Sequence, residues 1–195
     1  MSAPSTELRN QLRAKRRQLS MASQQHNQNQ ACTHFLHHLD HHPEVAKIAV
    51  FLSQDGELGT EQLIEQLWKH PGISVYLPIL VGQQMQFSLY HPQTSLKLNR
   101  FGIPEPQHSE ICAPPQLDWV LTPLVGFDLA GNRIGMGGGF YDRTFAFKQK
   151  RQSEKTPLLI GWAHSCQQLE SIEARAWDLP LDLLITEQGL LNFRR

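Results

Sequence analysis

The densest group of residues able to do chemistry occupies positions 131–143, which read Gly-Asn-Arg-Ile-Gly-Met-Gly-Gly-Gly-Phe-Tyr-Asp-Arg. The glycines at 135, 137, 138 and 139 leave the main chain bare, so a bound group can approach the amide N–H donors and the backbone can adopt positive φ. Arg133 adds a positive charge beside these donors. This combination predicts a binding site for an anion such as phosphate.

A helix is expected directly after the glycines, because residues 140–147 are largely apolar and aromatic and contain no helix breaker. Its first amides and its dipole would strengthen the attraction for an anion. Asp142 falls in the first turn of this helix. Its carboxylate either complements the helix dipole or brings Mg²⁺ to phosphate oxygens, and the residues alone leave both roles open.

The glycine run also has a plainer explanation as an ordinary turn. It does not read Gly-x-Gly-x-x-Gly, as nicotinamide-binding proteins do, and it lacks the Gly-Lys-Ser/Thr ending of a P-loop. The pattern therefore argues against a dinucleotide-dependent dehydrogenase and against a Walker-type NTPase. It leaves a phosphate site and a structural turn as the two alternatives.

The same run resembles the signature of a known enzyme family when the residues before it are included. Positions 118–128 read Asp-Trp-Val-Leu-Thr-Pro-Leu-Val-Gly-Phe-Asp, and with 131–142 they resemble 5-formyltetrahydrofolate cyclo-ligase, also called methenyltetrahydrofolate synthetase. Further matching segments follow the family's order at positions 8–9, 51–60, 102–106 and 177–182. The resemblance thus extends over most of the chain.

This resemblance implies an ATP- and Mg²⁺-dependent ligase that converts 5-formyltetrahydrofolate to 5,10-methenyltetrahydrofolate, ADP and phosphate. The formyl group is an amide and a poor electrophile. Transfer of the γ-phosphoryl group to its oxygen activates the carbon, and the tethered N10 then closes the ring. Such a reaction depends on positioning and charge stabilisation, so a glycine loop, arginines and Mg²⁺ are the parts it needs.

The resemblance places the nucleotide on the glycine loop and on the first helix. It implies that Arg133 and Tyr141 are catalytic and that Asp142 and Asp182 hold Mg²⁺. Ser5 stands where the family has a lysine, so one phosphate contact is missing at that ATP-side position. The implied ATP-binding set is Ser5, Arg9, Arg133, Ile134, Gly135, Met136, Gly137, Gly138, Gly139, Phe140 and Tyr141.

The folate is expected on the other side of the same loop. Glu57 follows a strand-like run, where ligands bind in α/β sheets, and it is either a loop carboxylate in water or, by resemblance, an acceptor for the N–H groups of the pterin. Glu105 lies between two prolines that would fix its backbone. The implied substrate-binding set is Leu52, Glu57, Glu105, Met136, Gly137, Gly138, Gly139 and Phe140.

The chain departs from the family at two positions of the glycine loop. Many members carry basic side chains at the positions of Met136 and Gly138, and this chain has none there. Transition-state charge would then fall on Arg133, the amides and the metal, or on Arg143 or Arg151. The sequence does not decide between these sources of positive charge.

The elements that must position these residues alternate along the chain. β-branched and aromatic runs predict strands, and apolar residues at helical spacing predict helices at 6–19, 23–39 and after Thr60, where a capping box is expected. This alternation implies a Rossmann-like, three-layer α/β/α sandwich with a mainly parallel sheet, in which residues 1–195 form one domain. Strands are expected at 47–52, 72–78, 85–90, 119–125, 158–162 and 182–186. Residues 91–117 hold five of the twelve prolines and are expected to form an ordered loop or lid.

The charged faces of the first two helices are expected to lie in water. Arg9, Arg13, Arg16 and Arg17 form the basic face of the first helix, and only the resemblance singles out Arg9. Histidines at 34, 37, 38, 41 and 42 include pairs at the i, i+4 spacing of helical metal ligands. They lack the glutamate of His-Glu-x-x-His, which favours a wet helix face over a zinc site.

Composition and charge exclude several classes of partner. Eighteen basic residues balance eighteen acidic ones, so no overall field attracts nucleic acid or an anionic membrane. No apolar run is long enough to span a bilayer and the N-terminus is polar, so we expect a cytoplasmic protein. Three widely spaced cysteines predict reduced, structural thiols. We expect folate and ATP as the only partners and a monomer. A sugar-phosphate isomerase or a phosphometabolite sensor of similar architecture are the alternatives.

Overall fold

The computed structural model describes residues 6–149 and 157–194. Within these residues it contains four α-helices: α1 (Thr6–Arg17), α2 (Met21–Leu39), α3 (Glu61–Lys69) and α4 (Phe140–Thr144). The strands are β1 (Lys47–Ala49), β2 (Ser74–Val81), β3 (Gln84–Leu89), β4 (Leu96–Leu98), β5 (Pro104–Pro106), β6 (Ile111–Cys112), β7 (Trp119–Pro123), β8 (Gly126–Phe127), β9 (Arg133–Ile134), β10 (Leu158–Trp162), β11 (Leu183–Thr186) and β12 (Gly189–Asn192). Short 3₁₀ turns occupy Pro114–Gln116, Ala146–Gln149 and Ser165–Gln167.

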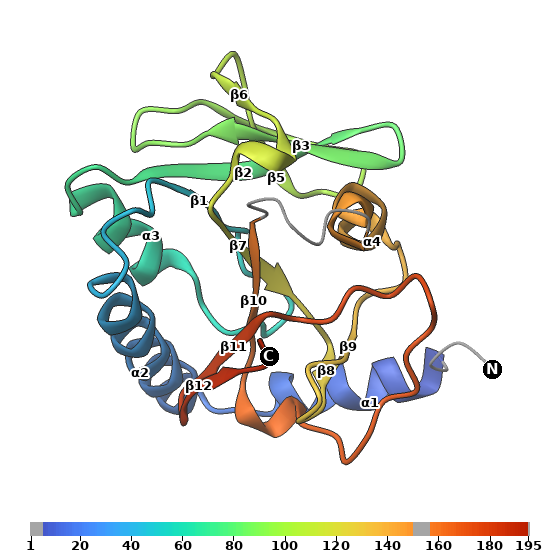
Figure 1. The fold of residues 1–195 in the computed structure, drawn as a ribbon. Helices are drawn as coiled ribbons and strands as arrows, with labels where there is room; N and C mark the ends of the chain where they lie inside the picture. The colour runs from blue at the N-terminus through green and yellow to red at the C-terminus, as the bar shows by residue number, and fades with distance from the viewer. Residues whose placement is uncertain (1–5, 150–156, 195) are drawn as a thin grey trace.

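The centre of the fold is an eight-stranded sheet in the order β12-β11-β10-β7-β1-β2-β3-β6 (Figure 1). Strands β11, β10, β7, β1 and β2 are parallel to one another. The antiparallel strands β12, β3 and β6 lie at the two edges. The mainly parallel α/β fold expected from the sequence is confirmed, and the antiparallel edges are what the sequence pattern did not predict.

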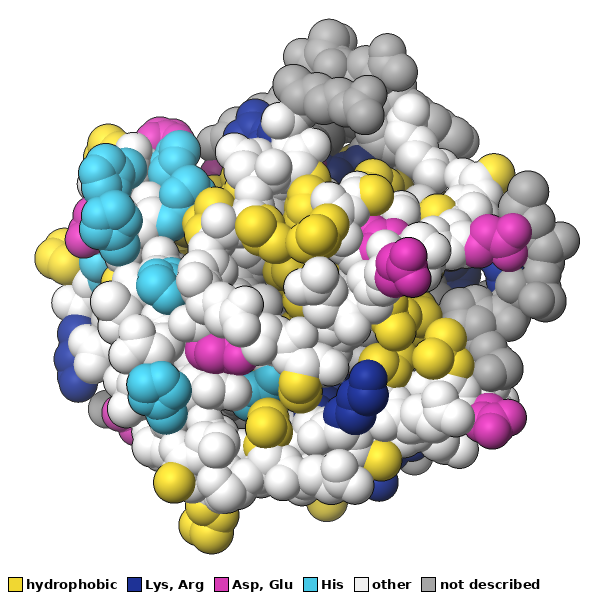
Figure 2. Space-filling view, turned by 90° about the horizontal axis from the view of Figure 1, so that it is seen from below, with side chains coloured by type: hydrophobic (Ala, Val, Ile, Leu, Met, Phe, Trp, Pro, Cys, Tyr) yellow, Lys and Arg dark blue, Asp and Glu magenta, His cyan; other side chains and the backbone are white. Residues whose placement is uncertain are grey.

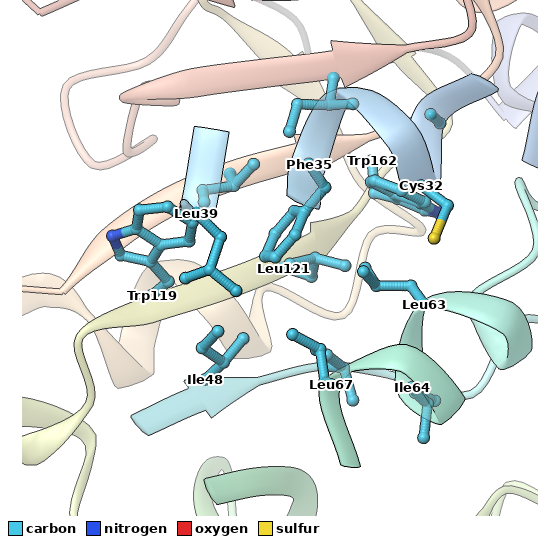
Figure 3. Packing of buried hydrophobic residues seen from close by; sticks show 14 of the residues in the cluster. Cys32, Phe35, Leu39, Ile48, Leu63, Ile64, Leu67, Trp119, Leu121 and Trp162 are labelled. Atoms are coloured by element: carbon cyan, nitrogen blue, oxygen red, sulfur yellow. The ribbon is translucent and has the colours of Figure 1, made fainter. Parts of the chain in front are cut away.

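Helices α2 and α3 cover one face of the sheet and bury the larger part of the core. Phe35 of α2 is fully buried and packs edge-to-face on Trp119 and Trp162 at ring-centroid distances of 5.4 and 6.2 Å (Figure 3). Leu63 and Leu67 extend this cluster from α3. No helix in the described part of the chain is long and apolar enough to cross a membrane.

The opposite face carries a thinner layer than the predicted helix at 140–147 would give. Helix α4 ends at Thr144, and a 3₁₀ turn continues the chain. Phe145, which follows α4, is fully buried against Phe87 of β3 and takes the place of a longer helix in the core. Because α4 has only five residues, its dipole contributes less to anion binding than a full helix would.

Helix α1 lies across the carboxyl ends of the central strands (Figure 1). Arg16 reaches from α1 to the backbone of Asp55, after β1, and to the carbonyl of Leu124, after β7. Its side chain is only 1% exposed. The prediction that α1 presents Arg16 to water is therefore wrong. The arginine satisfies loop carbonyls that the helix would otherwise bury.

The proline-rich stretch at 91–117 is partly ordered as a hairpin of β4 and β5. Glu105 of β5 accepts hydrogen bonds through Oε1 from the amide of Leu80 and from Asn99 Nδ2, at 2.9 and 2.8 Å. These bonds attach the hairpin to β2. The carboxylate of Glu105 therefore has a structural role in this segment.

The predicted capping box at Thr60 is also wrong. Thr60 is buried and makes no side-chain cap hydrogen bond to α3. Its hydroxyl donates to the carbonyl of Phe51 at 2.7 Å and accepts from the amide of Ser53 at 3.2 Å. It thus closes the loop between β1 and α3 upon itself, and that loop carries Glu57.

Candidate functional site

A pocket of about 390 Å³ opens beside the glycine loop. Its lining combines bare backbone with four arginines and two aspartates, an excess of two positive charges. The lining residues are Arg9, Arg133, Ile134, Gly135, Gly137, Gly139, Asp142, Arg143, Ala146, Gln149, Arg175, Trp177 and Asp178. The volume and charge suit a polar, anionic ligand of small-molecule size.

The backbone of the glycine loop turns its donors away from the protein. The carbonyl of Gly135 accepts from Arg9 Nε at 3.0 Å, and the carbonyl of Gly138 accepts from Arg143 Nη2 at 2.6 Å. In the described residues, no protein group accepts a hydrogen bond from the amides of residues 135–139. Gly137 and Gly139 have φ of 96° and 61°, a region that favours glycine. Arginines therefore hold the carbonyls while the amides remain for an anion.

Buried Asp128 fixes the turn that leads into this loop. Its carboxylate accepts from the amides of Ala130, Asn132 and Ile172 at 3.0, 2.9 and 2.8 Å. The amide of Asn132 belongs to the turn itself, whereas that of Ile172 belongs to the segment after β10. One carboxylate thus joins the turn before the glycine loop to the segment that leads to Arg175, and both stretches contribute residues to the pocket.

Arg133 and Asp142 form an ion pair at the wall of the pocket. Arg133 Nη2 donates to Asp142 Oδ1 at 2.6 Å, and the same oxygen accepts from the amide of Leu179 at 3.2 Å. Arg133 Nη1 also donates to the carbonyl of Leu179. Within the described residues, both hydrogen bonds of the Asp142 carboxylate use Oδ1 and none uses Oδ2.

Asp182 lies outside the residues that line this pocket. Its Oδ2 accepts from the amide of Leu159 at 2.7 Å and from Lys148 Nζ at 3.1 Å. In the described chain, no three His, Cys, Asp or Glu side chains could hold a metal ion together. The shared Asp142–Asp182 metal site therefore stays a prediction. Mg²⁺ would depend on phosphate oxygens for most of its ligands.

Glu57 lies in a second group of polar residues that Arg16 supports from α1. Its Oε1 is 3.6 Å from Arg16 Nη2, and its Oε2 accepts from the amide of Gln54 at 3.1 Å. The side chain is only 10% exposed. Burial raises the pKa of Glu57, and the charge of Arg16 opposes that rise. Glu57 is therefore not the loop carboxylate in water that the sequence left open.

The loop around Glu57 is rigidly braced. Trp162 Nε1 donates to the carbonyls of Leu58 and Gly59 at 3.2 and 3.1 Å. Asp55 has φ of 56° and Gly56 has φ of 71°, so the turn before Glu57 uses the left-handed region twice. These constraints hold the Glu57 backbone in place before any ligand binds.

Asp55 ties the same loop to the basic face of α1. It pairs with Arg13, Arg16 and Arg17, and Arg17 is half exposed. Burial alone would raise the pKa of Asp55, but the hydrogen bonds from Arg13 and Arg17, together with the charges of Arg13 and Arg16, lower it to about 2. The basic face of α1 is therefore an anchor for this loop as well as a wet surface.

Tyr141 follows the glycine loop in the first turn of α4. Burial raises its pKa, the negative charge of Glu57 raises it further, and Arg133 opposes the rise. Tyr141 therefore stays protonated at neutral pH and can donate a hydrogen bond. Its ring stacks on Phe145 at 6.3 Å, which fixes it against the sheet. Tyr141 is not among the residues that line the larger pocket.

A smaller pocket of about 330 Å³ borders the Glu57 loop on the side of α2. It is lined by Met21, Gln24, Gln25, Gln28, Ser53, Gln54, Asp55, Gly56, Glu57, Gly59 and Glu61. Of the other residues expected at the substrate, Leu52 is half-buried against the main core and Met136 is 56% exposed. Glu105 and Met136 line neither pocket. Ser5 and Arg151 lie outside the described residues.

The histidines of α2 stay apart from both pockets. Rings at positions 37 and 41 and at 38 and 42 lie 4.8 and 4.6 Å apart. The ring of His38 also stacks on Trp119. Burial is the main cause that lowers the pKa of His38, and the charges of the neighbouring histidines lower it further. Figure 2 shows most of the histidine side chains of that face gathered along one side.

Two residues of the site were not singled out from the sequence. Arg16 is buried behind Glu57, and Arg175 lines the larger pocket beside Trp177, which begins the family-matching segment at 177–182. Their signals were present but weak, because Arg16 is one of several arginines on α1 and residues 170–178 show no periodic pattern. Only the folded chain brings this segment to the glycine loop.

A family model described as the 5-formyltetrahydrofolate cyclo-ligase family matches residues 1–187. The chain belongs to this family. It is 43% identical to the 5-formyltetrahydrofolate cyclo-ligase of Escherichia coli over 183 residues, which cover 90% of this chain and 96% of the relative. It is 39% identical to the 5-formyltetrahydrofolate cyclo-ligase of Haemophilus influenzae over 189 residues, which cover 92% of this chain and 98% of that relative.

The fold agrees with this membership. The NMR structure of Aquifex aeolicus 5,10-methenyltetrahydrofolate synthetase superposes with a TM-score of 0.80 at 30% identity, covering 97% of this chain and 93% of that chain. The family model covers residues 1–187, so both the glycine loop and the Glu57 loop lie inside the matched region. Both loops lie at the carboxyl ends of the parallel strands, where α/β sheets bind ligands.

Proposed function

We propose that this member of the family is a 5-formyltetrahydrofolate cyclo-ligase that uses ATP and Mg²⁺ to make 5,10-methenyltetrahydrofolate. The observation that carries the proposal is the glycine loop, whose carbonyls are held by Arg9 and Arg143 while its amides face a ligand pocket. Family membership supports the reaction, and this geometry supports the glycine loop as the site for the phosphates. We assign Glu57 to the folate, and Tyr141, next to the glycine loop, to catalysis.

The fit of a nucleotide rests on space as well as charge. A methyl group added at Gly135 would meet no protein atom within 4 Å, although Gly135 lines the pocket. The space beside its backbone is therefore available to a ligand. We assign the amides of residues 135–140, with Arg9 and Arg133, to the phosphates. These donors stabilise the charge that develops during phosphoryl transfer.

Asp142 is the residue that best fits Mg²⁺. Asp142 lines the pocket, and its Oδ2 accepts no hydrogen bond from the part of the chain that the structure describes. Mg²⁺, when bound, would neutralise charge on the phosphate oxygens and orient them. Asp182 as a second carboxylate is a proposal carried over from the family, since Asp182 is hydrogen-bonded to Lys148 and Leu159.

The folate contacts follow from the same geometry. The Glu57 carboxylate, oriented by Arg16 and by the Gln54 amide, would accept the paired N–H groups of the pterin. Tyr141 would donate to the formyl oxygen as that oxygen attacks the γ-phosphorus and ADP leaves. N10 then attacks the formyl carbon, gives up its proton and expels phosphate, a ring closure that the tether of N10 favours. Leu52, Phe140 and the glycine loop would enclose the ring.

The expectations that residues 1–195 form one domain and that the protein is a cytoplasmic monomer are part of this proposal. They rest on the sequence, and the oligomeric state can be measured by sedimentation. A sugar-phosphate isomerase or a phosphometabolite sensor would not explain why a buried Glu57 is paired with Arg16. No observation favours either alternative.

One assay tests the proposed function. The purified protein is mixed with 5-formyltetrahydrofolate, ATP and Mg²⁺, and methenyltetrahydrofolate is followed by its near-ultraviolet absorbance. We expect the absorbance to rise only when all three are present and one ADP to form per product. Product without ATP would exclude the ligase mechanism. Nucleotide binding without any turnover would favour the sensor.

A further inference from the structure

Arg175 carries a buried donor that no group among residues 6–149 and 157–194 accepts from. Its Nε has no hydrogen-bond partner in the described chain, although the atom is shielded from solvent. A buried donor without a partner costs free energy, and this cost is greater when the donor belongs to a charged group. The side chain lines the larger pocket, so the space next to it belongs to the ligand.

The backbone around Arg175 holds it in this position. Asp178 Oδ2 accepts from the amide of Arg175 at 3.0 Å, and the amide of Asp178 donates to the carbonyl of Arg175 at 3.0 Å. The guanidinium lies 5.4 Å from the ring centroid of Trp177, within the range of a cation–π contact. Turn and ring together orient the guanidinium while leaving Nε unpaired.

The other arginines of the pocket are committed to the protein. Arg9 donates to Gly135, Arg133 to Asp142 and Leu179, and Arg143 to Gly138 and Gln83. Arg175 is therefore the pocket arginine for which the described residues provide an orienting turn but no side-chain acceptor. A planar guanidinium with unused donors is suited to the oxygens of a phosphate group.

We propose that Arg175 binds the polyphosphate of the nucleotide and supplies the positive charge that is missing at Met136 and Gly138. This inference rests on the proposed function for the identity of the nucleotide. The anion contact itself depends only on the pocket. Arg175 belongs to the segment after β10 and lines the same pocket as the glycine loop, so two separate stretches of chain would hold the phosphates.

The test compares Arg175→Gln and Arg175→Lys with the wild-type protein and with Lys69→Gln. Lys69 is exposed at the end of α3 and lines neither pocket, so this control removes one positive charge elsewhere. Binding of inorganic tripolyphosphate and of MgATP is measured by isothermal titration calorimetry, and turnover by the absorbance assay. The exposed Trp177 offers a fluorescence signal for the same titrations.

We expect Arg175→Gln to weaken the binding of both tripolyphosphate and MgATP about 10- to 100-fold, because one charged hydrogen bond is lost. The KM for folate should be unchanged. Arg175→Lys should retain part of the affinity, because an ammonium keeps the charge without the fork. Lys69→Gln should bind like the wild type. If Arg175→Gln binds the two probes more weakly and the wild-type protein shows no turnover, the anion contact is supported and the proposed function is rejected.

Two results would overturn the inference. One is wild-type affinity of Arg175→Gln for tripolyphosphate and MgATP. The other is a lowered unfolding temperature of this variant without any loss of affinity, which would assign Arg175 a structural role. If neither probe binds the wild-type protein, the contact and the ATP site fall together.

Discussion

The guanidinium of Arg16 is buried against the carboxylate of Glu57, with 3.6 Å between Nη2 and Oε1. The same guanidinium pairs with Asp55 and donates to the carbonyl of Leu124. A side chain of α1 therefore supports a loop after β1 and a loop after β7. Burial raises the pKa of the Glu57 carboxylate, which is only 10% exposed, and the charge of Arg16 opposes that rise by favouring the ionised form.

We predict that Arg16→Met lowers the free energy of unfolding by about 3 kcal/mol, because it leaves Asp55 and Glu57 without their buried partner. Arg17→Gln is the matched control. Arg17 pairs with the same Asp55 but is half exposed, so its loss should cost less than about 1 kcal/mol. Urea denaturation measures both. Equal losses for the two variants would refute the special role of the buried arginine.

The pH dependence of stability should carry the signature of Asp55. Its pKa in the folded chain is about 2, below its ordinary value of 3.8, so its stabilisation is complete above pH 4 and is lost as pH falls from 4 to 2. Asp55→Asn should be less stable than the wild type at pH 6, and the difference should shrink toward pH 2. Denaturation midpoints at a series of pH values measure this. A constant difference would contradict the prediction.

We predict that Glu57→Gln raises the KM for 5-formyltetrahydrofolate about 10-fold or more, because a charged hydrogen bond to the pterin is lost. The KM for ATP should change little. Glu61→Gln is the control, since Glu61 lines the same small pocket but is exposed and bonded to Ser53. Steady-state kinetics with each substrate varied in turn measure this. A larger effect on ATP would reject the pterin contact.

Two glycines of the loop should respond differently to alanine. Gly135 has open space for a methyl group, so Gly135→Ala should leave stability unchanged while the methyl group blocks the nucleotide. Gly137 has φ of 96°, so Gly137→Ala should also destabilise the fold, by about 1–2 kcal/mol. Thermal unfolding and MgATP titration separate the two effects. Full MgATP affinity in Gly135→Ala would show that the phosphates lie elsewhere.

Asp142→Asn should keep the hydrogen bond from the amide of Leu179 but weaken the hold on Mg²⁺. We expect the Mg²⁺ concentration for half-maximal turnover to rise at least about 10-fold. The absorbance assay at varied Mg²⁺ measures this, with Glu65→Gln on the exposed face of α3 as the control. An unchanged Mg²⁺ requirement would remove Asp142 from the metal site.

Local patterns were sufficient for most of the fold. The strand at 158–162 was predicted with its observed bounds, and those at 119–125 and 182–186 were predicted to within two residues at either end. Buried parallel strands read as uninterrupted apolar runs, which is why they stand out. The edge strands β6 and β12 were not predicted. Their short, half-exposed residues have no distinctive pattern.

The site was predicted in part. The glycine loop and Glu57 were identified because their residue types are unusual for their positions and match a family signature. The burial of Arg16 could not be predicted, since it depends on where loops from β1 and β7 meet α1. The same limit applied to Thr60, whose hydroxyl was expected at a helix cap and instead bridges a loop. Tertiary contacts decide such cases.

Helix α1 bonds to the glycine loop through Arg9 and Gly135 at one end and to the Glu57 loop through Arg16 at the other. Because α1 is attached at both ends, a nucleotide that moves one end of the helix would also move the other end. Affinities for the two reactants should therefore be coupled, and the coupling must be reciprocal: the factor by which folate tightens nucleotide binding equals the factor by which nucleotide tightens folate binding.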